Sequence, residues 1–89
     1  MKKNKENLFK LKNSLYFDED GETTYPYRWD EYSQLLAKKG QLAERFKLTD
    51  ELREEYGIHD KMWQYIWIFN SGCKWVLTQD EECEDFVKV

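Results

Sequence analysis

Residues 62–77 constrain the fold of this chain more than any other stretch. The segment, MWQYIWIFNSGCKWVL, holds three of the four tryptophans and the densest apolar surface in the 89 residues. Each large aromatic side chain buries on the order of 150–250 Å², which a small domain needs for its core. We therefore expect this segment to lie in the interior of a single small domain, residues 1–89.

Residues 60–69 are compatible with two structures. In a helix, Asp60 would be the N-cap, and Asn-Ser-Gly at residues 70–72 would end it. In a strand, Trp63, Tyr65, Trp67 and Phe69 would alternate with their neighbours, and these residue types favour strands. The capping residues at both ends favour the helix, and the strand remains the alternative.

The rest of the chain predicts an α+β fold. Residues 14–28 indicate an N-terminal β-hairpin that turns at Asp20 and Gly21, because an Asp-Gly pair tolerates the positive φ of a tight turn. Residues 74–78 and 86–89 indicate two strands that form a C-terminal β-hairpin. Residues 1–7 are polar and rich in lysine, and we expect them to fray.

Two to three helices are expected between the hairpins. One begins at Asp30 and carries leucines at helical spacing as far as Phe46, with a break favoured at Gly40 after two lysines. The next is capped by Thr49 or Asp50 and stops at Gly57.

Residues 52–66 resemble a helix-turn-helix, and the C-terminal hairpin would extend the likeness to a winged helix. The apolar and glycine positions of such a motif are occupied by Leu52, Gly57, Ile58, Trp63 and Ile66. Arg53 and Trp63 depart from the pattern, which prefers a small and a β-branched residue there. The resemblance implies a DNA-binding regulator whose groove-facing residues are Lys61, Gln64 and Tyr65.

Charge argues against that alternative and suggests a different surface. The net charge is −4, and residues 80–85 at the would-be wing carry five carboxylates, which repel phosphate. The two acidic turns of the sequence have two interpretations. Either they are simply solvated, or they form a negative face that docks on a basic protein surface. The candidate acidic face consists of Asp18, Glu19, Asp20, Glu22, Asp80, Glu81, Glu82, Glu84 and Asp85.

No arrangement of residues indicates catalysis, a metal site or a cofactor. Cys73, Cys83 and His59 are three candidate metal ligands, whereas a structural zinc site usually needs four. The serines have no identifiable base, and the glycines are scattered rather than gathered in a phosphate-binding loop. No apolar run approaches the roughly 20 residues of a membrane-spanning helix. The cysteines, without a secretion signal, indicate reduced thiols in the cytoplasm.

The leading hypothesis is therefore a small acidic binding protein that is not an enzyme. It would contact a protein with a basic surface, such as a nucleic-acid-binding enzyme, as a phosphate mimic and inhibitor of the kind encoded by phages or mobile elements. Aromatic anchors for such an interface would come from Tyr25, Tyr27, Trp29 and Tyr65. The alternative hypothesis is the helix-turn-helix regulator.

Overall fold

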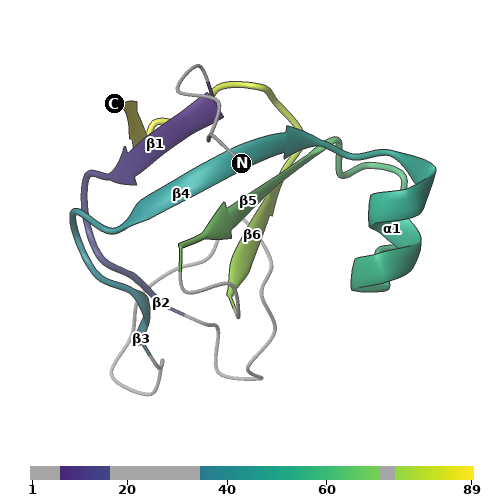
Figure 1. Ribbon diagram of the computed structural model, residues 1–89, viewed down its shortest axis with the longest axis horizontal. Helices are drawn as coiled ribbons and strands as arrows, with labels where there is room; N and C mark the ends of the chain where they lie inside the picture. The colour runs from purple at the N-terminus through teal and green to yellow at the C-terminus, as the bar shows by residue number, and fades with distance from the viewer. Residues whose placement is uncertain (1–6, 17–34, 71–73) are drawn as a thin grey trace.

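A five-stranded antiparallel sheet dominates the computed structural model (Figure 1). The structure describes residues 7–16, 35–70 and 74–89. In sheet order, the five strands are β6 (Trp75–Thr78), β5 (Tyr65–Phe69), β4 (Leu42–Lys47), β1 (Leu8–Leu11) and β7 (Phe86–Lys88). A separate pair of strands, β2 (Leu15–Tyr16) and β3 (Leu35–Ala37), lies at one end of the sheet, and the one helix of the described residues is α1 (Asp50–Tyr56). The predicted α+β fold with two to three helices is therefore wrong, because the described chain is mostly β.

The segment predicted to be the second helix of a helix-turn-helix is a strand. β5 pairs with β4 on one side and with β6 on the other, so its backbone polar groups are satisfied between neighbours. Asp60 does cap, but it caps a turn: its Oδ1 accepts a hydrogen bond from the Met62 backbone N–H at 2.9 Å. A residue that caps a helix also caps a turn, so Asp60 did not determine the structure of the residues that follow it.

The predicted helix that ends at Phe46 is also replaced by strands. Among the described residues of that stretch, β3 and β4 are joined by a turn at Gly40, whose φ is +87°. A positive φ suits glycine and reverses the chain, so leucines on either side of Gly40 belong to different strands. In β4, Ala43 is buried and pairs with Phe9 of β1 and Phe69 of β5. Residues 30–34, where this helix was predicted to begin, lie outside the described residues.

The helix predicted after residue 48 is confirmed. Thr49 is the N-cap, and its Oγ1 accepts a hydrogen bond from the Leu52 backbone N–H at 3.1 Å. Gly57 ends the helix with φ +70°, and Ile58 N–H returns to the Arg53 carbonyl at 2.8 Å. Local capping therefore determines α1 at both ends.

The two hairpins predicted at the ends are partly correct. β6 and β7 are strands where predicted, but they do not pair, because they form opposite edges of the sheet. β2 is a strand, and the described partner beside it is β3. Its predicted partner around residues 23–27 lies outside the described residues, as do residues 1–6 of the predicted frayed start.

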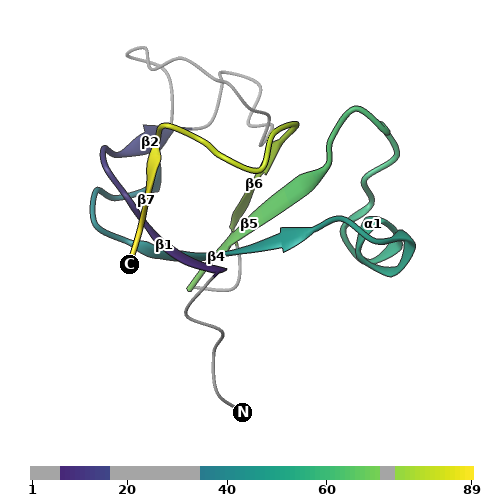
Figure 2. The same cartoon turned by 90° about the horizontal axis from the view of Figure 1, so that it is seen from above.

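The sheet is strongly curled, with one core on its concave side. Phe86 of β7 stacks on Trp67 of β5 with ring centroids 4.2 Å apart, although β1 and β4 lie between these strands in the sheet. Only a curled sheet brings them together, and Figure 2 shows strands β7, β1, β4, β5 and β6 following one another around the curl. This inner cluster is completed by Phe9, Leu11, Leu15, Leu36, Ala37, Ala43, Phe69 and Val76.

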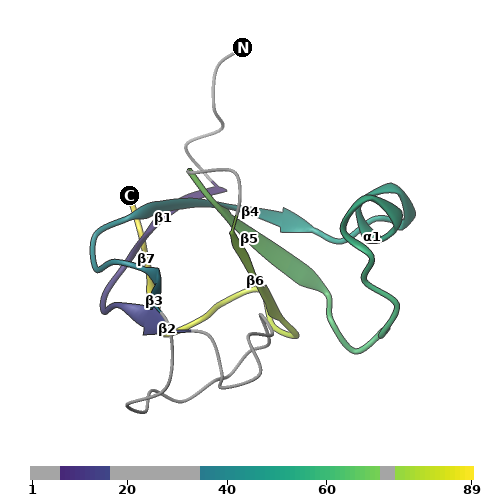
Figure 3. The same cartoon turned by 90° about the horizontal axis from the view of Figure 1, so that it is seen from below.

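A second cluster lies on the convex side, beneath the connection from β4 to β5. The connection carries α1, which lies outside the curl on the side away from β7 (Figures 2 and 3). Its buried members are Leu48, Ile58, Ile66 and Leu77. Ile66 and Trp67 are therefore both fully buried although they point to opposite faces of β5. Because both sides of β5 are covered, its apolar residues do not alternate with polar ones.

Candidate functional site

The predicted acidic residues of the C-terminal turn form one loop, residues 79–85, which we call the acidic loop. Thr78 begins it: the buried hydroxyl accepts a hydrogen bond from Trp67 Nε1 at 2.8 Å and donates to the Asp80 carbonyl at 2.9 Å. At the other end, the Lys12 backbone N–H donates to the Asp85 carbonyl at 2.9 Å. Both ends of the acidic loop are thus fastened to the sheet.

Arg45 of β4 holds the middle of the acidic loop. Its Nη1 donates to the Glu81 carbonyl at 2.8 Å, and its Nη2 lies 3.4 Å from Glu81 Oε1. The guanidinium also lies over the rings of Phe9 and Trp67, 4.8 and 5.6 Å from their centroids. The Arg45 side chain is only 14% exposed. A cation from the inner face therefore fixes the loop and compensates the charge of Glu81.

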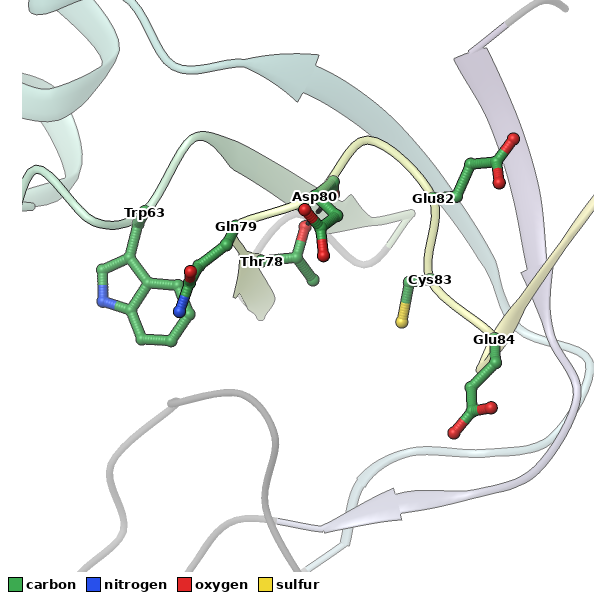
Figure 4. Close-up of a pocket in the computed structure, with 7 residues that line it drawn as sticks. All are labelled: Trp63, Thr78, Gln79, Asp80, Glu82, Cys83 and Glu84. Carbon is green, nitrogen blue, oxygen red and sulfur yellow. Dashed lines mark hydrogen bonds between the residues drawn. The ribbon is translucent and has the colours of Figure 1, made fainter.

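The remaining carboxylates differ in exposure. Asp80, Glu82 and Glu84 are exposed, whereas Asp85 is half-buried. Glu82 and Glu84 point in opposite directions from the backbone (Figure 4). The outward negative charge of the loop is consequently that of Asp80, Glu82 and Glu84.

A pocket of about 380 Å³ opens between the acidic loop and Trp63 (Figure 4). Trp63 lies at one end and Glu84 at the other. The pocket is lined by Trp63, Thr78, Gln79, Asp80, Glu82, Cys83 and Glu84. An aromatic wall facing carboxylates is suited to a cationic side chain, because the ring face and the carboxylates both attract positive charge.

Arg53 fixes the backbone that carries Trp63. Its Nη2 donates to the Trp63 carbonyl at 2.6 Å, and its Nη1 donates to the Asp60 carbonyl at 3.2 Å. The departure of Arg53 from a helix-turn-helix pattern therefore has a different explanation, since the arginine holds the connection before β5. The pocket wall is held as firmly as the loop opposite.

A wider hollow of about 580 Å³ lies on the other side of the acidic loop. Arg45 and Lys88 contribute positive charge to it, together with carboxylates of the loop. The mixed charge makes this hollow less selective for a cation than the pocket beside Trp63. Its lining is Phe9, Arg45, Glu81, Glu82, Cys83, Glu84, Phe86 and Lys88.

The other predicted site residues lie either outside the described residues or on other parts of the fold. Asp18, Glu19, Asp20 and Glu22 of the first acidic turn lie outside the described residues, as do the aromatic anchors Tyr25, Tyr27 and Trp29. The predicted DNA-contacting set is not on a recognition helix. Lys61 and Gln64 are exposed in the connection before β5, where Gln64 Nε2 donates to the Lys61 carbonyl at 2.7 Å, and Tyr65 is half-buried on β5.

Sequence alone did not identify Arg45 or Trp63 as parts of the site. Arg45 lies in a run that was predicted to be helical, and Trp63 lies in the segment for which the helix was favoured and the strand was the alternative. In the strand β4, Arg45 points to the same side as Ala43, which is buried. The pairing that brings it under the acidic loop spans residues 45 and 81 and has no local pattern.

Within residues 7–16, 35–70 and 74–89, no three His, Cys, Asp or Glu side chains are grouped as metal ligands would be. Burial raises the pKa of Tyr56 above its ordinary value of 10.0, and the neighbouring Glu55 carboxylate adds to the increase, but Tyr56 lies on α1, away from the acidic loop. No helix in these same ranges is long and apolar enough to cross a membrane.

Comparison with known proteins adds no information about this pocket. No protein-family model, no curated protein and no solved structure matches the chain.

Proposed function

We propose that this is a non-catalytic binding protein that docks on a basic protein surface through its acidic loop. The observation that supports this most directly is the fixed pocket between Trp63 and the exposed carboxylates of Asp80, Glu82 and Glu84. A lysine or arginine of the partner would place its stem along the indole and its charge among the carboxylates. We place this interaction in the cytoplasm.

The partner would be a protein that handles nucleic acid. Such proteins carry basic grooves that bind phosphate, and a loop that displays several carboxylates is attracted to the same groove. Hydrogen bonds at both ends and Arg45 in the middle hold the acidic loop, so little conformational entropy is lost when it docks. Occupation of the groove would inhibit the partner.

The test compares two charge-neutralised triple variants in binding to a fluorescein-labelled oligo-arginine peptide, measured by fluorescence anisotropy at low salt. One variant carries Asp80→Asn, Glu82→Gln and Glu84→Gln in the acidic loop. The matched control carries Glu51→Gln, Glu54→Gln and Glu55→Gln, which are exposed on α1. Each triple removes three negative charges, so the pair separates the position of the charge from the net charge.

We expect the loop variant to bind about tenfold more weakly, equivalent to about 1.4 kcal/mol, and the helix variant to bind within about twofold of the parent. Trp63→Leu should also weaken binding, because it removes the aromatic wall without changing charge. Equal losses in the two triple variants would mean that only net charge matters, and the proposal would then fail.

A further inference from the structure

One part of the convex sheet face is not covered by α1. Side chains of directly paired residues point to the same side of a sheet. Val87 pairs with Lys10 and Lys10 pairs with Leu42, while Leu8 pairs with Glu44 and Glu44 pairs with Ile68. We call this surface the open sheet face, and it consists of Leu8, Lys10, Leu42, Glu44, Ile68 and Val87.

The open sheet face is largely apolar and accessible. Val87 is 40% exposed, and Val89, whose backbone N–H donates to the Leu8 carbonyl, is 60% exposed. Beside them, a groove of about 270 Å³ lies between Leu8, Leu42 and Ile68. Contiguous apolar surface of this kind usually marks a contact with another molecule. Phe46 borders the groove and packs against the cluster under α1, so the apolar surface is continuous with a core.

Lys10 and Glu44 are the two charged members of this face. Glu44 of β4 is half-buried and lies directly opposite Leu8 of β1. Lys10 follows two residues after Leu8 on β1, so Glu44 and Lys10 are diagonal neighbours. Such diagonal neighbours are about 7–8 Å apart, a distance that long side chains can span. Within the described part of the chain, no lysine or arginine nitrogen lies within ion-pair distance of the Glu44 carboxylate. Glu44 and Lys10 are each available to an opposite charge from outside.

We propose that a second copy of this chain binds on the open sheet face. The two-fold axis would lie in the plane of contact and pass between Lys10 and Glu44. An occupant of this face covers one cation and one anion, and each covered charge needs an opposite partner. A second copy supplies both, because two-fold symmetry places Lys10 of one copy against Glu44 of the other, and the reverse. The apolar side chains of this face in one copy would meet the same side chains in the other copy.

Charge separates this occupant from the basic partner of the acidic loop. A basic protein on the open sheet face would set a like charge against Lys10, whereas a second copy leaves no like charges in contact. The acidic loop is fastened through Arg45, which belongs to the opposite, concave face of β4. The dimer would therefore leave both acidic loops exposed, and its formation does not depend on the function proposed above.

Charge reversal tests the inference on the full chain. Sedimentation equilibrium would be measured for the parent, Lys10→Glu, Glu44→Lys and the double variant that exchanges the two charges. We expect the parent to be a dimer, each single variant to raise the dimer dissociation constant at least about tenfold, and the double variant to return within about threefold of the parent. Glu82→Lys is the matched control, because it makes the same charge change on the acidic loop and should leave the dimer unchanged.

Two results would overturn the inference. The first is a parent protein that stays monomeric into the millimolar range. The second is a double variant that associates no better than the single variants, because the two charges would then not be partners. Far-UV circular dichroism of each variant confirms that a loss of association is not a loss of fold.

Discussion

The two faces of the curled sheet are covered in different ways. On the concave face, rings from β1, β5 and β7 pack directly on one another: Phe9 and Trp67 lie 4.9 Å apart edge-to-face, and Trp67 and Phe86 are stacked. On the convex face, the cover that the described residues provide is the connection from β4 to β5, whose helix, α1, has no buried residue. The concave core depends on strands from both ends of the chain, whereas the convex cluster depends on one local excursion.

This difference predicts two levels of stability. The concave cluster contains residues from every strand of the sheet and from the β2–β3 pair, so its loss is loss of the fold. The convex cluster covers β5 and β6 through a seven-residue helix and its flanks. A helix of this length is marginal alone, so α1 should open without the rest of the sheet.

The largest effect is expected from Trp67→Ala. Trp67 is fully buried, and its indole N–H is bonded to Thr78, so truncation leaves a large cavity and a buried hydroxyl with one partner fewer. We expect a loss of about 3–5 kcal/mol in the free energy of unfolding, measured by urea denaturation. The matched control is Trp75→Ala, the same change on the convex face, where Trp75 is half-buried and meets Tyr56 edge-on at 5.7 Å. Equal losses at the two tryptophans would contradict the contrast between the faces.

A smaller and more local effect is expected from Ile58→Ala. Ile58 is buried in the convex cluster directly after α1. We expect a loss of about 2 kcal/mol, at the low end for isoleucine truncation, because the cluster borders solvent. Amide hydrogen exchange should become faster in α1 while the amides of β1 and β4 keep their protection. Uniformly faster exchange would show that the two faces unfold together.

The smallest effect concerns Tyr56 and alkaline pH. Burial, with the Glu55 carboxylate adding to it, raises the pKa of the Tyr56 hydroxyl in the folded protein. The unfolded chain releases this proton near pH 10, so the stabilisation is complete below that pH and is lost as pH rises through the folded pKa. We expect the urea midpoint to fall above about pH 10, and to fall less in Tyr56→Phe. The same decline in both proteins would exclude Tyr56 as its cause.

The parts of the fold that were predictable from sequence are those with local causes. Thr49 and Gly57 determine α1 through hydrogen bonds within a few residues, and the strands near residues 75–78 and 86–88 follow from their residue types. Asp60 shows why the rest was not predictable. Its carboxylate can cap a helix or a turn, and here it caps a turn. Residues 65–69 form a strand because β4 and β6, from other parts of the chain, pair with them.

The candidate site follows the same division. The exposure of Asp80, Glu82 and Glu84 was predictable, because a dense run of carboxylates cannot be buried unpaired. Arg45 under Glu81 was not predictable, because it depends on the register of β4 and on the curl of the sheet. The local composition therefore predicted which carboxylates are exposed, whereas the hydrogen bonds that hold the acidic loop depend on tertiary pairing.

The position of β7 has a consequence for how the protein folds. Phe9 pairs with Lys88, so the first and last strands of the sheet are neighbours although almost the whole chain separates them. Closing so long a loop is entropically costly, and folding rates fall as such distant pairings dominate a structure. Phe86 of β7 stacks on Trp67, so this part of the concave core is complete only when the distant β7 has joined the sheet.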